Sequence, residues 1–355
     1  MRSAAILYGA AEFRKDVCAG NLNYEVMGKR KFKSLDLVPL CSVAYKYMFH
    51  ACRLPSKEEN MDSYAIYDPS IYTHCIIARK GLFFKMDFID KSTHDPLPIG
   101  IIEARLQKII DLADSMEESY QLGILTTDHR DNWADAREVL VQNDLILEDL
   151  EKLESGAFLL CLDEAAPLSR SQCASLFWHG GNSLHCNRWF DKSLQFICTA
   201  NGKVGFVGEH SMMDGMPTLN LCKYIEKVDY VKARDRTAAT MSSNSKTSSQ
   251  SNDVCGVDHL FQKLTLAKSA SEISAKVQSS RESFSHLVRG HEIIAHDFKD
   301  FGGNLIKEIG HSPDAFVQIA IQLASYRLFG KQVATYEATQ VRQFRHGRYV
   351  LFMTR

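Results

Sequence analysis

The sequence predicts an α/β fold in which helices pack against a mixed sheet as a sandwich. Apolar runs of strand length alternate with amphipathic helical patterns over residues 73–226, an order that favours neither an all-α nor an all-β domain. The run AFLLCL at 157–162 is apolar throughout, as expected for a strand buried on both faces. The 355 residues suffice for two ordinary domains.

The elements of the first half follow from their patterns. Residues 73–89 (THCIIARKGLFFKMDFI) predict two strands joined by a turn at 79–81. Residues 99–118 carry apolar side chains at helical spacing, which predicts an amphipathic helix. A short strand at 123–127 and a helix over 132–147 are expected next.

A hairpin is predicted immediately before a conspicuous histidine. Residues 193–199 and 204–208 have strand character, and Asn201-Gly202-Lys203 forms the turn between them. This arrangement delivers His210 at the end of the second strand. Pro217 then lies near the start of a predicted helix.

Composition divides the chain. Residues 237–253 are almost wholly Ser, Thr, Asn, Ala and Gln, too polar to offset ordering entropy, which predicts disorder. We therefore expect a His-bearing domain at 1–236, a Ser-rich insertion at 237–256 and a second domain at 257–355. Residues 258–294 look helical, and 312–329 predict a helix capped by Ser312 and ended by Gly330.

Bulk properties favour a small-molecule partner. The 42 basic and 43 acidic residues give a net charge of −1, so no global attraction to nucleic acid is expected. The ten cysteines form no C-x-x-C pair, which gives no support to a zinc site and is typical of a reducing compartment. No apolar stretch reaches 18 residues, and we predict no transmembrane segment.

The candidate chemistry lies in an H-x-x-x-D-G pattern formed by His210, Asp214 and Gly215. A histidine at a strand end is often only a hydrogen-bonded structural residue. His210 and Asp214 on one helix could also bind a metal, but Gly215 and Pro217 disfavour a continuous helix. We predict no metal site. Histidine as a general base is the third interpretation.

Longer motifs around this pattern resemble the choline/carnitine acyltransferase family. The matching blocks keep the family's order over most of the chain, and the carnitine acetyltransferase branch fits best: LTTDHRDNWA at 125–134, HGG at 179–181, NRWFDKSLQFI at 187–197, Glu209-His210, SPDAFVQ at 312–318, Tyr336-Glu337 and HGR at 346–348. The resemblance implies the two-layer sandwich of acyl-CoA-dependent acyltransferases. It also implies reversible transfer of an acyl group, expected to be acetyl, between coenzyme A and the hydroxyl of carnitine.

The resemblance assigns roles to individual residues. His210 would be the general base, which deprotonates the carnitine hydroxyl or, in reverse, the thiol. Asp214 and Gly215 would support the segment, with Asp214 facing an arginine. Glu209 points away from His210 if the segment is extended, and we interpret it as a solvated or structural carboxylate.

The coenzyme A side of the family pattern matches only in part. Lys307 and Asp314 would contact coenzyme A, and Tyr336 would bind the carnitine carboxylate. A second expected lysine is replaced by Gly303 or Asn304. Acyl-CoA would act as co-substrate, with no tightly bound cofactor. Family members suggest a monomer in mitochondria or peroxisomes.

The resemblance also implies a longer protein, because the family pattern continues beyond residue 348 with a threonine, a Ser-Thr-Ser loop and most of another domain. Its leading helices are missing as well. We expect a sequence truncated at both ends, with an incomplete second domain and His210 in an open cleft. Three interpretations stay open: a carnitine acyltransferase, an inactive fragment that binds coenzyme A or a partner subunit, and an acyltransferase for choline or another alcohol.

Overall fold

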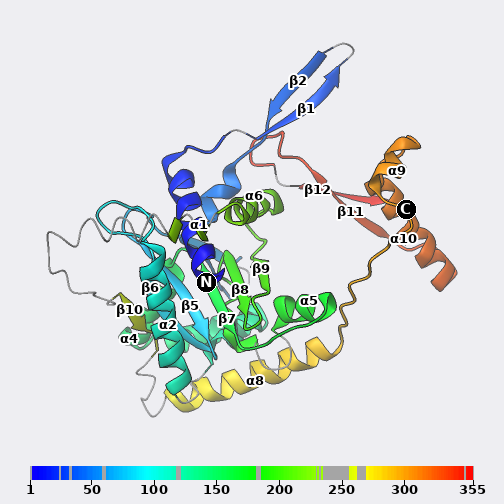
Figure 1. Cartoon of the computed structure of the whole chain (residues 1–355). Coiled ribbons are helices and arrows are strands. Elements are labelled where there is room, and N and C mark those ends of the chain that lie inside the picture. Colours follow the sequence, from blue (N-terminus) through cyan, green and yellow to red (C-terminus); the bar gives the residue numbers. More distant parts are fainter. Residues whose placement is uncertain are drawn as a thin grey trace. The chain divides into compact units, whose positions relative to one another are not determined.

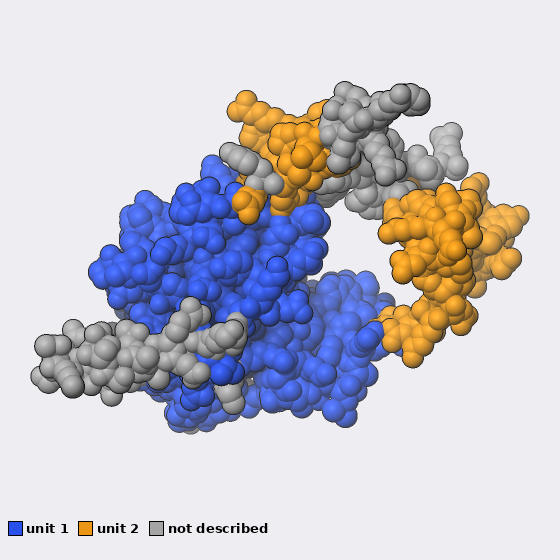
Figure 2. Space-filling view, turned by 45° about the horizontal axis from the view of Figure 1, so that its top comes forward, with its two compact units in different colours: residues 1–22, 44–293 blue, residues 23–43, 294–355 orange. Residues whose placement is uncertain are grey.

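The chain divides into two compact units, each described by itself below (Figure 2). Unit 1 comprises residues 1–22 and 44–293, and unit 2 comprises residues 23–43 and 294–355. The structure is a computed structural model that describes residues 2–23, 25–31, 34–57, 61–116, 121–180, 185–228, 230–231, 233–234, 256–261, 269–347 and 349–354. Residues 237–255 of the predicted Ser-rich insertion lie outside these ranges, and the predicted domain boundaries stay a prediction.

A six-stranded mixed sheet forms the centre of unit 1, in agreement with the predicted α/β class (Figure 1). Its order is β10-β6-β5-β7-β8-β9. Strands β5, β7 and β8 run parallel, whereas β10, β6 and β9 each pair antiparallel with a neighbour. The strands are β5 (His74–Arg79), β6 (Leu82–Asp87), β7 (Leu159–Asp163), β8 (Leu194–Thr199), β9 (Val204–Gly208) and β10 (Val257–His259).

Helices cover both faces of this sheet. Because side chains alternate along a strand, Ile77 joins one core cluster and Ile76 the other. The first cluster includes residues of α1 (Arg2–Ala19), α2 (Ile99–Ser115) and α6 (Gly215–Glu226). The second includes residues of η2 (Leu122–Thr127), α3 (Arg130–Leu140), α4 (Asp144–Ser155) and α8 (Ser269–Arg289). Burial on both faces explains why 157–162 is apolar throughout.

The remaining described elements of this region are short: η1 (Val43–Tyr47), β3 (Ala51–Leu54), β4 (Ser63–Ile66), α5 (Arg170–His179) and η3 (His185–Asn187). Strands β3 and β4 form an antiparallel pair of their own. An isolated bridge between Cys52 and Lys192 joins β3 to the segment before β8.

Both predicted hairpins are confirmed. Lys80 and Gly81 join β5 to β6 with φ values of 53° and 75°, the pair of positive angles that suits a two-residue turn between twisted strands. Strands β8 and β9 pair as expected, and β9 ends at Gly208. Loop chemistry and strand alternation were therefore sufficient to predict these local structures.

Three predicted elements were wrong in type or extent. Residues 122–127 form a 3₁₀ helix instead of a strand, because the hydroxyls of Thr126 and Thr127 donate to carbonyls three residues earlier. The helix predicted over 132–147 is two helices, since Asn143 accepts amide bonds and caps α4. Residues 257–259, near the start of the predicted helical region 258–294, belong instead to strand β10.

The described residues of unit 2 form two hairpins and two helices. The hairpins are β1 (Val26–Lys31) with β2 (Ser34–Pro39) and β11 (Thr335–Gln340) with β12 (Tyr349–Thr354); the helices are α9 (Gly303–Glu308) and α10 (Pro313–Phe329). Ser312 caps α10 and Gly330 ends it, as predicted. No residue of α10 is buried, and its apolar side chains are largely exposed.

Two buried histidines should make the stability of the protein depend on pH. Burial lowers the pKa of His74 to about 4, and burial together with the Arg14 charge lowers the pKa of His50 well below its usual value. Below pH 6.5 these two histidines bind protons in the unfolded chain but stay neutral in the folded protein. The free energy of unfolding should therefore fall by about 1.4 kcal/mol per pH unit for each histidine as the pH drops from 6.5 toward 4.

Urea unfolding at a series of pH values measures this dependence. The variant His74→Gln removes one titrating group and keeps an amide donor for the Lys152 carbonyl, which accepts from His74 Nε2 at 2.7 Å. Its slope against pH should be shallower by about 1.4 kcal/mol per unit. An unchanged slope would contradict the assignment.

Candidate active site

His210 lies in the loop between β9 and α6, and it is exposed. Its Nδ1 is 2.8 Å from the carbonyl oxygen of Met213. A carbonyl oxygen only accepts hydrogen bonds, so the neutral imidazole that makes this bond carries its proton on Nδ1. The lone pair able to accept a proton is then on Nε2, as a general base requires.

The other two residues of the H-x-x-x-D-G pattern follow in the same loop. Asp214 caps α6, and its carboxylate accepts from the Gly215 amide at 2.8 Å. Within the described part of the chain no arginine pairs with Asp214, so the arginine partner stays a prediction. Open space surrounds the position of a Cβ at Gly215, and steric crowding does not explain this glycine.

Glu209 is buried next to His210. Its carboxylate accepts from the amide of Ser211 at 3.1 Å and from the Ser211 hydroxyl at 2.6 Å. Arg53 of β3 also donates to it, at 3.2 Å. The side chain is therefore a buried, hydrogen-bonded carboxylate, which fits the structural half of our interpretation and not the solvated half.

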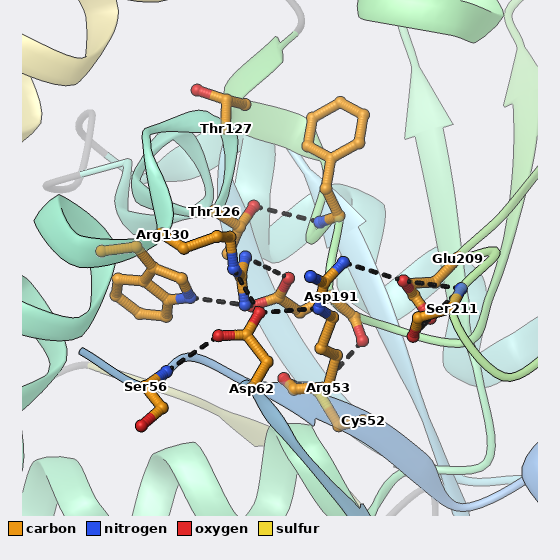
Figure 3. A network of polar contacts seen from close by, with 12 residues as sticks. Cys52, Arg53, Ser56, Asp62, Thr126, Thr127, Arg130, Asp191, Glu209 and Ser211 are labelled. Carbon is orange, nitrogen blue, oxygen red and sulfur yellow. Dashed lines mark hydrogen bonds and ion pairs between the residues drawn. The ribbon is translucent and has the colours of Figure 1, made fainter. Parts of the chain in front are cut away.

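A chain of alternating charges continues from Arg53 (Figure 3). Arg53 and Arg130 donate to the same oxygen of Asp62, at 2.7 and 2.6 Å. Arg130, the first residue of α3, also uses two nitrogens to bind Asp191, at 2.7 and 3.2 Å. The indole of Trp133 donates to Asp191 at 2.7 Å. The loop of His210 is thus connected to α3 and to the segment that precedes β8.

The two aspartates of this chain respond differently to burial. Burial raises the pKa of Asp191 despite Arg130 and Trp133. Burial also acts to raise the pKa of Asp62, but the amide of Ser56 and the two arginines outweigh it and hold the pKa below its usual value. Charge pairing is strong enough at Asp62 to keep the carboxylate ionised.

The segment 187–193, the first part of the 187–197 block that resembles the family, is almost wholly buried. Arg188 binds both oxygens of Asp163, at 2.9 and 2.8 Å, with neither side chain exposed. Lys192 donates to the Glu154 carbonyl, and burial lowers its pKa to about 8. The segment connects elements inside unit 1. Its polar composition contains no signal of this burial, so sequence reasoning missed the structural role.

The predicted coenzyme A residues belong to unit 2. Lys307 is exposed on α9, and Asp314 lies in the first turn of α10. These two helices adjoin, since a Cβ at Gly303 would meet the ring of Pro313 at 3.6 Å. That distance is an ordinary contact, so the backbone at Gly303 could accept the lysine that the family pattern expects.

Tyr336 is on β11, and its side chain lies outside the described part. The binding roles of Lys307, Asp314 and Tyr336 stay predictions. Across the described residues, no group of three or more His, Cys, Asp or Glu side chains could hold a metal ion. Within the same ranges, no helix combines the length and the apolar character needed to cross a membrane.

Comparison with known proteins decides the family. The family profile described as Choline/Carnitine o-acyltransferase matches residues 1–351. The chain belongs to this family. Human carnitine O-acetyltransferase is 29% identical over 353 residues, which cover 96% of this chain and 53% of the human protein.

Two further relatives show how the family divides. The mitochondrial carnitine O-acetyltransferase of Saccharomyces cerevisiae is 30% identical over 322 residues, 88% of this chain and 45% of the yeast protein. Human choline O-acetyltransferase is 33% identical over 319 residues, 87% of this chain and 40% of that protein. The chain spans about half the length of the carnitine enzymes it matches.

The Arg188–Asp163 pair should contribute strongly to folding. The variant Arg188→Met leaves the Asp163 charge buried without its ion-pair partner, which should lower the free energy of unfolding by about 3–5 kcal/mol. Urea unfolding measures the loss. Lys15→Met is the control, because the 2.5 Å contact of Lys15 with Asp95 is exposed on both sides, and it should change stability little.

A double variant separates the pair from packing. Arg188→Met with Asp163→Leu removes both charges, so part of the lost stability should return. If Arg188→Met and Lys15→Met lowered the free energy of unfolding equally, the buried pair would contribute no more to stability than the exposed one.

Proposed function

We propose that this protein transfers an acyl group, acetyl in the first instance, reversibly between coenzyme A and the hydroxyl of carnitine. The observation that carries the proposal is the His210 imidazole, exposed where β9 ends and held through Nδ1 by the Met213 carbonyl. In the same proposal the chain has the two-layer sandwich of acyl-CoA-dependent acyltransferases, with unit 2 as part of an incomplete second domain.

The chemistry requires a positioned base because an alcohol is a poor nucleophile. Nε2 of His210 would take the hydroxyl proton as the alcohol oxygen attacks the thioester carbon. The carbon–sulfur bond then breaks, and the imidazolium returns the proton to the leaving thiolate. The products are the acyl ester and free coenzyme A, and the imidazole is regenerated. In the reverse direction the same nitrogen would deprotonate the thiol.

Binding would fall to residues of unit 2. Lys307 would meet the phosphates of coenzyme A as a point charge, and Asp314 would contact the same molecule. Tyr336 would donate a hydrogen bond to the carboxylate of carnitine. The names of the matched human and yeast carnitine O-acetyltransferases support carnitine as the alcohol.

Choline is the second candidate alcohol. The human choline O-acetyltransferase match has an identity as high as those of the carnitine enzymes. Carnitine carries a carboxylate and choline does not, so the two substrates differ in the group that Tyr336 would recognise. An inactive fragment is the third candidate, since the chain spans about half of these relatives.

Removal of His210 tests catalysis. The purified protein is incubated with acetyl-CoA and carnitine, and free thiol is measured over time. His210→Ala should reduce turnover by about 10²–10⁴-fold, the contribution of a positioned general base. His129→Ala is the matched control, because His129 is an exposed histidine at the start of α3, and it should keep full activity.

Two results would contradict the proposal. Thiol release that survives His210→Ala would place the base elsewhere. No release from the unaltered protein with either alcohol would favour the inactive fragment.

Replacement of Tyr336 tests the choice of alcohol. Tyr336→Phe removes a single hydroxyl, so the KM for carnitine should rise by about tenfold or more, as expected for one hydrogen bond to a charged group. The KM for choline should stay constant. An equal effect on both alcohols would show that Tyr336 does not recognise the carboxylate.

A further inference from the structure

Glu209, the residue before His210, makes hydrogen bonds through both its backbone and its side chain. Its amide donates to the Ser193 carbonyl at 3.1 Å, its carboxylate binds Ser211 through two donors, and Arg53 approaches the same carboxylate. The Glu209 side chain thus connects Arg53 to Ser211, the residue that follows His210 (Figure 3).

We propose that Glu209 is a positioning residue for His210, in that its buried carboxylate fixes the loop in the conformation that binds Nδ1 to the Met213 carbonyl. The inference deepens the proposed function and rests on it for its catalytic meaning. Its structural content concerns only the orientation and tautomer of one imidazole.

The first step of the argument is local. The bond between His210 Nδ1 and the Met213 carbonyl closes over three residues, so it forms only if the loop turns back at Ser211. The Glu209 carboxylate imposes that turn, because it accepts both the Ser211 amide and the Ser211 hydroxyl. Loss of the carboxylate would free the turn, and the imidazole would lose its fixed acceptor.

The second step anchors the carboxylate itself. Arg53 donates to Glu209 from Nη1 and to Asp62 from Nε, so the guanidinium is held from two sides. Asp62 is in turn held by Arg130, which is bound to the buried Asp191. A buried charge that moved away from its partner would incur a large desolvation cost. These linked ion pairs therefore oppose displacement of Glu209.

The third step explains why the tautomer matters. A neutral imidazole with its proton on Nε2 could not donate to Met213, and its proton-accepting nitrogen would face the backbone. General-base catalysis needs the opposite arrangement. By fixing the loop, Glu209 would therefore determine which nitrogen of His210 is available to the substrate.

Nitrogen NMR of the 355-residue protein tests this inference without substrate. Histidine is labelled with ¹⁵N, and spectra are recorded at about pH 8, where an unperturbed imidazole is neutral. The signals of His210 are those missing from His210→Ala. In the unaltered protein they should show the proton on Nδ1.

The test variant is Glu209→Gln, which keeps the shape but places an amide donor against the donors of Ser211 and Arg53. The ratio of Nδ1–H to Nε2–H tautomer should fall by about fivefold, the change expected when one hydrogen bond is lost. Glu154→Gln is the matched control. Glu154 is also buried and also paired to an arginine, Arg137, at 2.6 Å, and its replacement should leave the His210 signals unchanged.

A second variant covers the case in which Glu209→Gln does not fold. Ser211→Ala keeps the Glu209–Arg53 pair and removes the hydroxyl donor, so the tautomer ratio should move in the same direction by a smaller factor. A tautomer ratio unchanged in every folded variant would overturn the inference. So would an equal shift in Glu154→Gln, which would indicate a general loss of packing.

Kinetics then connect the loop to catalysis. Glu209→Gln should lower kcat and leave the KM for acetyl-CoA within about twofold, because only an interaction needed in the transition state is lost. A raised KM at constant kcat would contradict a positioning role. If the unaltered protein shows no turnover, the proposed function fails, while the NMR result still decides whether Glu209 orients His210.

Discussion

Unit 1 depends on keeping the carboxylate of Asp191 charged inside the protein. Burial raises the pKa of Asp191, and an unpaired charge there would be strongly unfavourable. Arg130 and the indole of Trp133 supply the compensating donors. Because α3 begins at Arg130 and Asp191 precedes β8, satisfaction of this one group fixes the helix against the sheet. The same arginine then extends the contact through Asp62 toward Arg53 and the histidine loop.

Residues 187–193, which are part of one of the motifs that resemble the family, thus form a buried connection between elements of unit 1. In segment 187–193, Arg188 pairs with Asp163, Trp189 packs between Phe83 and Trp133, and Lys192 binds a backbone carbonyl. Such groups are tolerated inside a protein only when their partners are in place. Replacement of one of these side chains would leave a buried polar partner unsatisfied. None of them is assigned a role in acyl transfer.

The general-base step of the proposed function requires few residues. One imidazole has to be reachable, oriented and in the correct tautomer. His210 meets the first condition by its exposure at the end of β9 and the other two through its bond to Met213. The residues expected to hold coenzyme A and the alcohol are in unit 2. In the proposed function, the general base would therefore belong to unit 1 and the substrate-binding residues to unit 2.

Sequence patterns were sufficient to predict the class of fold, both hairpins, the helix that Ser312 caps and the place of His210, because each depends on local periodicity or turn chemistry. They did not determine that 122–127 is a 3₁₀ helix, where a Cβ on Gly123 would lie 2.2 Å from the Arg188 carbonyl. Nor could they show that Glu209, Arg53, Asp62 and Arg130 meet. These residues are far apart along the chain, and which charges pair in the interior depends on how strands and helices pack, which only the tertiary structure decides.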